Sequence, residues 1–419
     1  MDLSVTHPTK NDTTWFCCQL GAREHYSIPR ALKQAGQLGA LLTDAWVQPE
    51  SLVKKIPVSS LKSLGDRHHP NLSNTEVYSF TNQLILFEVQ QRLQRTESWP
   101  RMISRNNWYQ GQIIKKLKQL SSQNPHHKKI LFSYSYAALE IFKYAKSQGW
   151  QTILGQIDPG VEEEKIVIEE FQKDQTLAPD WQPVPQKYWQ DWQLECELSD
   201  RILVNSEWSK KLLVKGGVEE TKIKVVPLVY QAPKNVDDFT RKYPAQFTKE
   251  RPLRVLFLGL ITLRKGIRAC LEAIAPLVDD ETIEFWFVGS QQINIPEEFH
   301  NRKNIHWVGS VPRSETANYY RQADVFLFPS LSDGFGLTQL EAQAWQLPII
   351  ASNRCGDVVT DGEDGVVLSD VSGEEIRRSL LQLKSQPELL QKFADAIQPK
   401  PQFSLEYLSQ SLQKLTVSA

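Results

Sequence analysis

The chain has 419 residues, a formal net charge of -1 and a hydrophobic content of 41%. This length exceeds one ordinary domain, and the apolar residues can fill two cores of common size. The balanced charge gives no global basic excess for nucleic acid and no extended acidic tail. No stretch reaches the roughly 18 apolar residues that a membrane-spanning helix needs. The polar start, MDLSVTHPTKNDTT, lacks the features of a signal peptide.

Short strand-like runs alternate with helical patterns along the chain. In order, the runs are TWFCCQL (14–20), KKILFSYS (128–135), QTILGQI (151–157), RILVNS (201–206), KIKVVPLV (222–229), LRVLFLGL (253–260), IEFWFVGS (283–290), IHWVGS (305–310), DVFLFPS (324–330), LPIIAS (347–352) and DGVVL (364–368). Such alternation predicts parallel sheets flanked by helices. We therefore expect an α/β protein with two Rossmann-like, doubly wound domains.

A polar segment with three prolines, residues 231–252, separates the two series of strand and helix units. We place the domain boundary there, with a first domain over residues 1–235 and a second over 236–400. Doubly wound sheets bind ligands beyond the carboxyl ends of their strands, at the switch in strand order. The expected active site is therefore a cleft between the two domains.

Charge is distributed unevenly within the first domain. Residues 98–139 contain no acidic residue and seven basic ones, with Trp99, Trp108 and Tyr109 nearby. Such a surface could lie on anionic lipid, which predicts peripheral membrane contact through residues 101–129. The alternative is a solvated helix face, neutralised by residues 151–200, which carry twelve acidic and three basic residues.

The stretch PSLSDGFGLTQLEAQAW, residues 329–345, combines two carboxylates with two glycines after a buried strand. Asp333 lies on the predicted strand-to-helix loop, where Gly334 and Gly336 let the backbone approach a ligand closely. The amides that follow open a helix, whose positive end attracts anions. Glu341 lies on the second turn. Carboxylates on either side of phosphate-binding amides suit a nucleotide sugar. The alternative makes Asp333 a capping residue and Glu341 a solvated helix residue.

A basic pair follows another buried strand in LGLITLRKG, residues 258–266. Arg264 and Lys265 would lie at the same sheet edge as Asp333 and could neutralise a diphosphate. Alternatively, the two residues are exposed cations at the N-terminus of a helix, although cations there interact unfavourably with the helix dipole.

These segments resemble segments of a known family, and they follow one another in the same order as in that family, over about residues 195–370. The resemblance also includes ELSDRILVNSEWSKKLL, FWFVGS, HWVGSVPRSETANYYRQADVFLFPS and GDVVTDGEDGVVL. The chain resembles the group 1 (family 4) retaining glycosyltransferases of GT-B architecture, and the acid-x7-Glu element is the most specific part. The resemblance implies two facing Rossmann-like domains and a nucleotide-diphosphate sugar as donor. It also implies a hexosyltransferase type of enzyme with no metal and no cofactor. PQFSLEYLSQSLQKL resembles the terminal helix, here within 401–419, that packs back on the first domain.

The resemblance also implies roles for individual residues. Asp333 takes the place of the glutamate that contacts the donor sugar, Glu341 that of the ribose-binding glutamate, and Lys265 that of the diphosphate lysine. The expected catalytic residues are therefore Asp333, Lys265 and Arg264. The expected donor-binding residues are Glu341, Gly334, Phe335, Gly336, Leu337, Thr338 and the loop residues Gly21 and Ala22.

Several positions depart from the family pattern. Asp333 is one methylene shorter than glutamate, Leu260 stands where an arginine is usual, and Gln346 replaces a glycine, where a positive φ would cost about 1 kcal/mol. The histidine pattern of the acceptor side is missing. Candidate acceptor-side residues are Arg23, His25, Tyr134 and Asp158, although a lone histidine such as His25 is more often structural.

The sequence thus predicts transfer of a sugar from a nucleotide-diphosphate sugar, with a UDP-sugar favoured over GDP- or ADP-sugars, to a glycan, lipid-linked or small hydroxyl acceptor. Two alternatives stay open: a nucleotide-sugar epimerase or hydrolase of the same architecture, and a non-catalytic nucleotide-sugar-binding protein. We expect no nucleic acid partner and a cytoplasmic location that could include the inner face of the membrane. The oligomeric state is not readable from the sequence.

Overall fold

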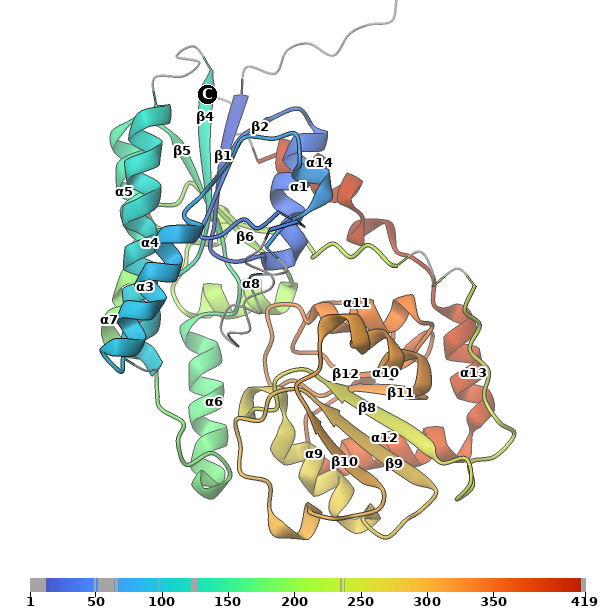
Figure 1. Cartoon of the computed structure of the whole chain (residues 1–419). Helices are drawn as coiled ribbons and strands as arrows, with labels where there is room; N and C mark the ends of the chain where they lie inside the picture. The colour runs from blue at the N-terminus through green and yellow to red at the C-terminus, as the bar shows by residue number, and fades with distance from the viewer. Residues whose placement is uncertain are drawn as a thin grey trace, which may run out of the picture.

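The protein is described here from a computed structural model over residues 13–48, 50–51, 64, 67–96, 98–121, 127–233, 236 and 238–415. Two parallel β-sheets, each with helices on both faces, form two domains stacked along the long axis of the molecule (Figure 1). The predicted α/β class with two Rossmann-like domains is confirmed. None of the helices in this described part is long and apolar enough to cross a membrane.

The first sheet has seven strands in the order β3-β2-β1-β4-β5-β6-β7. The strands are β1 (Thr13–Gln19), β2 (Leu38–Thr43), β3 (Val77–Ser79), β4 (Lys128–Tyr134), β5 (Gln151–Gly155), β6 (Arg201–Val204) and β7 (Ile223–Val225). The central strands are buried on both faces, which explains their continuous apolar sequences. In the described part of this domain, the helices are α1 (Ser27–Gln34), α3 (Thr81–Leu93), α4 (Ser98–Leu120), α5 (Leu139–Ser147), α6 (Val161–Lys173), α7 (Gln186–Leu198) and α8 (Glu207–Lys215).

The second sheet has six strands in the order β10-β9-β8-β11-β12-β13. The strands are β8 (Leu253–Leu258), β9 (Ile283–Val288), β10 (Ile305–Gly309), β11 (Val325–Phe328), β12 (Ile349–Ser352) and β13 (Gly365–Leu368). The helices are α9 (Ile267–Ile274), α10 (Thr316–Gln322), α11 (Leu337–Ala344), α12 (Gly373–Ser385) and α13 (Pro387–Ala396).

The strand order reverses between β1 and β4 in the first sheet and between β8 and β11 in the second. Ligands of doubly wound sheets bind at such switch points, outside the carboxyl ends of the strands. The loops that follow β1, β8 and β11 carry the predicted site residues Gly21, Lys265 and Asp333, and the loop after β4 carries Tyr136, which the sequence did not single out. The topology therefore directs the two sets of predicted site residues toward the space between the domains.

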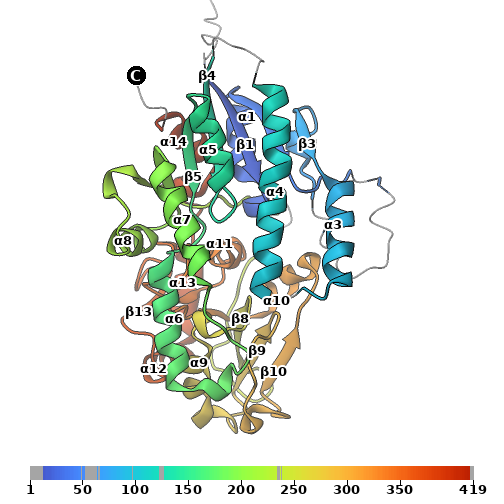
Figure 2. The same ribbon diagram turned by 90° about the vertical axis from the view of Figure 1, so that its left-hand side faces the viewer.

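Two segments of the chain cross between the domains. Helix α6 extends from the first domain along the second (Figures 1 and 2), and Val167, Leu177 and Ala178 are buried in the core cluster of the second sheet. Near the C-terminus, α14 (Leu405–Gln413) returns to the first domain and packs on α1, where Ser409 Oγ donates to the carbonyl of Ala31 at 3.2 Å. Each domain is thus packed against a segment from the other half of the chain.

Candidate functional site

The β11–α11 loop and the loop after β8 form a charged cluster. Lys265 Nζ donates to Asp333 Oδ2, and Arg264 Nη1 lies 3.6 Å from the same carboxylate oxygen. Arg264 also donates to the carbonyl of Ser332 at 3.1 Å, and its own carbonyl accepts from Leu331 at 2.9 Å. The structure thus brings the three expected catalytic residues together at one edge of the second sheet.

Glycines shape the backbone of the β11–α11 loop. Gly336 has φ +86°, and a Cβ there would lie 2.3 Å from the ring of Phe328. A Cβ on Gly334 would lie 2.3 Å from the carbonyl oxygen of Ile157 in the first domain. The backbone can therefore turn into α11 and approach the other domain only without these side chains. The first two amides of α11, those of Leu337 and Thr338, have no partner within the helix and present a site for anions.

Asp333 is buried, and its charge is maintained by the two cations. Burial alone would raise the pKa of the Asp333 carboxyl, but Lys265 and Arg264 outweigh it and lower the pKa from 3.8 to about 2. Burial lowers the pKa of Lys265. A buried carboxylate with two cations leaves one net positive charge for an incoming anion.

Glu163, in the first turn of α6, faces this cluster from the first domain. Its Oε1 lies 3.8 Å from Arg264 Nε. Burial, with the nearby charges of Asp158 and Asp333, raises the pKa of Glu163 from 4.5 to about 8, although Arg264 opposes this shift. The raised pKa favours the protonated form of Glu163, in which the carboxyl can donate a hydrogen bond.

This protonation predicts a pH-dependent effect of Glu163→Gln. The folded protein binds the Glu163 proton more tightly than the unfolded chain does, so the wild-type free energy of unfolding falls as pH rises from about 4.5 to about 8, by on the order of 1 kcal/mol per pH unit. Glutamine keeps the neutral form. We expect the variant to gain stability relative to wild type across this range in urea unfolding measurements.

Glu169→Gln is the matched control for this measurement, because Glu169 is an exposed residue of the same helix. It should show no such trend. Burial also raises the pKa of Glu195, to about 7. Its contribution to the free energy of unfolding is the same in wild type and in both variants, so it cancels when they are compared. An unchanged stability difference between pH 5 and pH 8 would show that Glu163 is ionised throughout.

Glu341 lines a cavity of about 510 Å³ between the domains. Tyr320 donates its hydroxyl to Glu341 Oε2 at 2.9 Å, and Arg313 Nη2 lies 3.9 Å from Oε1. Burial raises the pKa of the Glu341 carboxyl. Residues of both domains line this Glu341 cavity, among them His25, Arg30, His69, Tyr230, Gln231, Arg313, Tyr320 and Trp345. It is lined by mixed polar and aromatic groups suited to a nucleoside.

His25 reaches across the cleft to the second domain. Its Nδ1 lies 2.6 Å from Arg313 Nη1. Burial and the charges of Arg313 and Arg30 lower the pKa of His25 to about 4, so the imidazole is neutral at neutral pH. The structure therefore places His25 at the Glu341 cavity, apart from Asp158.

The loop after β1 has an unusual backbone. Gly21 has φ +86°, and three consecutive residues, Glu24, His25 and Tyr26, have φ of 50°, 53° and 60°. Such conformations are unfavourable for residues with side chains and persist only where their surroundings hold them. The Gly21 amide donates to Asp44 Oδ1 at 2.9 Å, and Arg105 pairs with the other oxygen of this buried carboxylate at 2.9 Å. The buried carboxylate of Asp44 thus holds the loop that carries Gly21 and Ala22 in place.

The remaining acceptor-side candidates, Asp158, Tyr134 and Arg23, do not line the Glu341 cavity. Asp158 lines a separate cavity of about 360 Å³, together with Glu163, Leu260 and Arg264. We call it the cleft cavity. Tyr134 is buried at the end of β4, and the guanidinium of Arg23 lies 5.7 Å from its ring centre. Neither Tyr134 nor Arg23 lines the cleft cavity.

Two departures from the family pattern have a visible structural setting. Leu260 is 46% exposed and borders the cleft cavity, with Arg264 beside it. Gln346 adopts a φ of 51° after α11, a left-handed conformation that favours glycine, and its Oε1 accepts from the Arg241 amide at 3.2 Å. This hydrogen bond offsets part of the conformational cost of a non-glycine residue.

Sequence reasoning missed Glu163, Arg313 and Tyr320. Glu163 belongs to the acidic run that follows Gly160, and its position in the first turn of a helix after a strand was a usable signal. Arg313 and Tyr320 precede β11, 28 and 21 residues before Glu341, and only the packing of α10 and the residues just before it places them at Glu341.

Comparison with known proteins identifies the second domain. Residues 252–386 match the family model described as glycosyl transferases group 1. The chain is 28% identical over 175 residues to an uncharacterized 41.2 kDa protein in the cps region of Klebsiella pneumoniae, covering 41% of this chain and 48% of that protein. It is 32% identical over 154 residues to D-inositol 3-phosphate glycosyltransferase of Streptomyces bingchenggensis, covering 33% of this chain and 34% of that enzyme. The chain thus spans less than half the length of these curated relatives.

Solved structures match the fold over nearly the whole chain. Anabaena HepE, in complex with UDP and glucose, superposes with a TM-score of 0.61 at 11% identity, covering 96% of this chain and 98% of that one. A mutant of S. aureus TarM, in complex with fondaparinux, α-GlcNAc-glycerol and UDP, superposes with a TM-score of 0.62 at 11% identity, covering 97% and 100%. At this identity, the likeness defines the shared two-domain fold.

Proposed function

We propose that the chain is a group 1 glycosyltransferase, because residues 252–386 match the model of that family. It would transfer a sugar from a nucleotide-diphosphate sugar to a hydroxyl acceptor, with retention of anomeric configuration and without a metal. The observation that carries this proposal is the cluster of Arg264, Lys265 and Asp333 at the start of α11. UDP-sugars are the favoured donors, and glycans, lipid-linked sugars or small hydroxyl compounds are the acceptor classes.

The diphosphate would bind the cationic pair and the first amides of α11. It would compete with Asp333 for Lys265, and the carboxylate so released could accept hydrogen bonds from the donor sugar. Arg264, Lys265 and the amides would then stabilise the charge that develops on the leaving diphosphate. These groups supply the positive charge that a metal supplies elsewhere. This is the basis for proposing a metal-independent reaction.

In the proposed step, the bond from the anomeric carbon to the diphosphate breaks while the acceptor oxygen bonds to the same face of that carbon. The acceptor proton passes to an oxygen of the leaving diphosphate. The raised pKa of Glu163 favours its protonated form, so we do not assign this proton to Glu163. Its proximity to Arg264 instead suits a hydrogen bond to the bound donor or acceptor.

The nucleoside end of the donor would occupy the Glu341 cavity. The Glu341 carboxylate, oriented by Tyr320, could accept hydrogen bonds from both ribose hydroxyls. Arg313 lies beside it and adds positive charge near the diphosphate.

A thermal-shift panel tests this proposal. UDP, GDP and ADP, with their sugars, are compared in the presence and absence of EDTA, because a true donor stabilises the folded protein by mass action. We expect one nucleotide to raise Tm equally in both conditions. Products made with the best donor are then analysed with and without acceptors, with anomeric configuration assigned by NMR. Turnover of donor alone would favour an epimerase or hydrolase, whereas binding without any turnover would favour a binding protein.

Cytoplasmic location and peripheral membrane contact through residues 101–129 stay predictions. Residues 122–126 of that segment lie outside the described part of the chain. Several of its cations have partners within the protein: Arg101 pairs with Glu88, Arg105 with Asp44, Lys116 lies 3.9 Å from the Tyr78 ring centre, and Lys129 donates to Ser121. Sedimentation with anionic vesicles checks the contact. Absence of salt-sensitive binding would favour the solvated-face alternative.

A further inference from the structure

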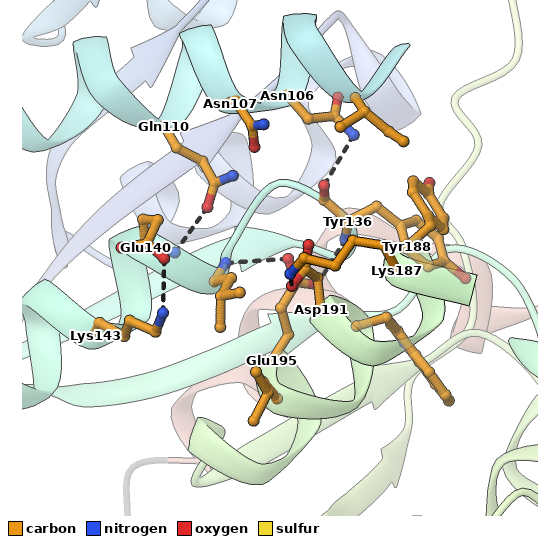
Figure 3. Close-up of a pocket in the computed structure, with 14 residues that line it drawn as sticks. Asn106, Asn107, Gln110, Tyr136, Glu140, Lys143, Lys187, Tyr188, Asp191 and Glu195 are labelled. Carbon is orange, nitrogen blue, oxygen red and sulfur yellow. Dashed lines mark hydrogen bonds and ion pairs between the residues drawn. The ribbon is translucent and has the colours of Figure 1, made fainter. Parts of the chain in front are cut away.

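Another cavity, of about 290 Å³, lies in the first domain next to the cleft cavity. It opens between α4, α5 and α7 (Figure 3). We call it the distal cavity, and it is lined by Ile103, Asn106, Asn107, Gln110, Tyr136, Leu139, Glu140, Lys143, Lys187, Tyr188, Asp191, Trp192, Leu194 and Glu195. Tyr136 and Tyr188 line both this cavity and the cleft cavity. The two spaces are therefore neighbours that share an aromatic wall.

The shared wall is part of a larger aromatic cluster. The rings of Tyr136 and Tyr188 are stacked with centres 4.7 Å apart, and Trp99 lies edge-on to Tyr188 at 5.3 Å. Trp189 lies 6.0 Å from Tyr136 and 5.6 Å from Trp192. Four of these five rings are only partly buried. Partly exposed rings in a cavity offer flat apolar faces, on which the C–H faces of sugar rings pack.

Buried polar contacts keep this wall in place. Glu195 accepts from the amide of Tyr136 at 2.7 Å, and from those of Ala138 at 2.8 Å and Leu139 at 3.0 Å. On the cleft side, the Tyr136 hydroxyl donates to Asp158, and Trp189 Nε1 donates to Glu164. The rings therefore need little rearrangement to receive a ligand, which lowers the cost of binding.

Polar groups in both cavities suit hydroxyl groups. In Figure 3, Asn106, Asn107 and Gln110 extend from α4 into the distal cavity. Asn106 donates to the Tyr136 carbonyl at 2.9 Å, and Gln110 accepts from the Glu140 amide at 2.8 Å, so each keeps one amide atom for a ligand. Amides both donate to and accept from hydroxyls. Asp158 and Glu164 line the cleft cavity and disfavour an anionic ligand.

We propose that the cleft cavity and the distal cavity together bind an uncharged oligosaccharide acceptor. This inference rests on the proposed function. The reacting end of the sugar chain lies in the cleft cavity beside Asp158 and Arg264, close to the donor loop, since Gly334 packs against Ile157 and Asp158. The chain continues past Tyr136 and Tyr188 into the distal cavity. The acceptor class is thereby narrowed from any hydroxyl compound to a glycan chain.

The test measures the dependence of affinity on chain length. A printed glycan array, probed with the full-length protein without donor, identifies the best uncharged ligand. Isothermal titration then compares a series of that glycan from monosaccharide to hexasaccharide. We expect affinity to rise by about tenfold or more once the chain is long enough to reach the distal cavity, the gain that about 1.4 kcal/mol of added contact provides.

Asn107→Trp fills the distal cavity from the exposed face of α4 and should abolish this gain with length. Gln119→Trp is the matched control, because it places the same side chain on an exposed position of the same helix away from the cavities, and it should keep the gain. Affinity independent of length, equal behaviour of the two variants, or preference for sulfated or uronate glycans would each overturn the inference. Donor binding, measured separately by thermal shift with UDP-sugars, reports on the proposed function alone.

Discussion

Replacing Lys265 with methionine is expected to lower kcat/KM for the nucleotide sugar by about 10²–10³-fold, the effect of removing one preorganised donor to a developing negative charge. Lys265 is buried, contacts Asp333 directly, and lies 4.7 Å from the ring centre of Phe328. Methionine keeps the packing on this ring and removes the charge. Steady-state kinetics with the donor identified by thermal shift provide the measurement.

The variant also needs a control for folding. Removal of one partner from a buried ion pair can cost about 3–5 kcal/mol of stability, because the other charge stays buried. In Lys265→Met, Asp333 keeps Arg264 as a partner at 3.6 Å, so the loss of stability should fall below this range, and urea unfolding of the variant checks that it is folded. Lys384→Met removes a cation of the same domain that pairs with Asp280, and it should leave turnover unchanged. Wild-type turnover in the single variant would exclude Lys265 from the reaction.

Replacing Glu341 with alanine is expected to weaken binding of UDP and of uridine alike, by about 10–100-fold. The reason is that hydrogen bonds to a charged group are worth about 1.5–3 kcal/mol each. Tyr320→Phe keeps the carboxylate but removes the hydroxyl that orients it at 2.9 Å, so its effect should be smaller. Isothermal titration with each ligand provides the measurement.

The two substitutions separate the two ends of the donor site. Lys265→Met should weaken UDP but leave uridine, which has no phosphate, unaffected, whereas Glu341→Ala should weaken both. Glu284→Ala is the matched control, because this partly buried carboxylate of the same domain pairs with Arg254 and His306, and it should change neither affinity. Unchanged uridine binding in Glu341→Ala would show that the ribose does not bind in the Glu341 cavity.

Local pattern alone determined much of this protein. Alternating apolar runs and helical stripes are encoded residue by residue, so the α/β class and the two sheets follow from them. The strand, glycine and helix signals around Asp333 likewise lie within twenty residues of one another. The same holds for the basic pair after β8, since the carboxyl ends of parallel strands necessarily share one edge of a sheet.

The tertiary structure alone decided which distant residues complete the site. Glu163 reaches Arg264 because α6 packs along the second domain. Tyr320 on α10 and Arg313 just before it reach Glu341 through the packing of this segment. The aromatic wall likewise combines Trp99, Tyr136 and Tyr188 from three separate segments. Such contacts depend on how whole elements pack together, and the raised pKa of Glu163 depends on burial by both domains. Neither property is carried by any short stretch of sequence, because both arise only when surfaces far apart in the chain exclude water together.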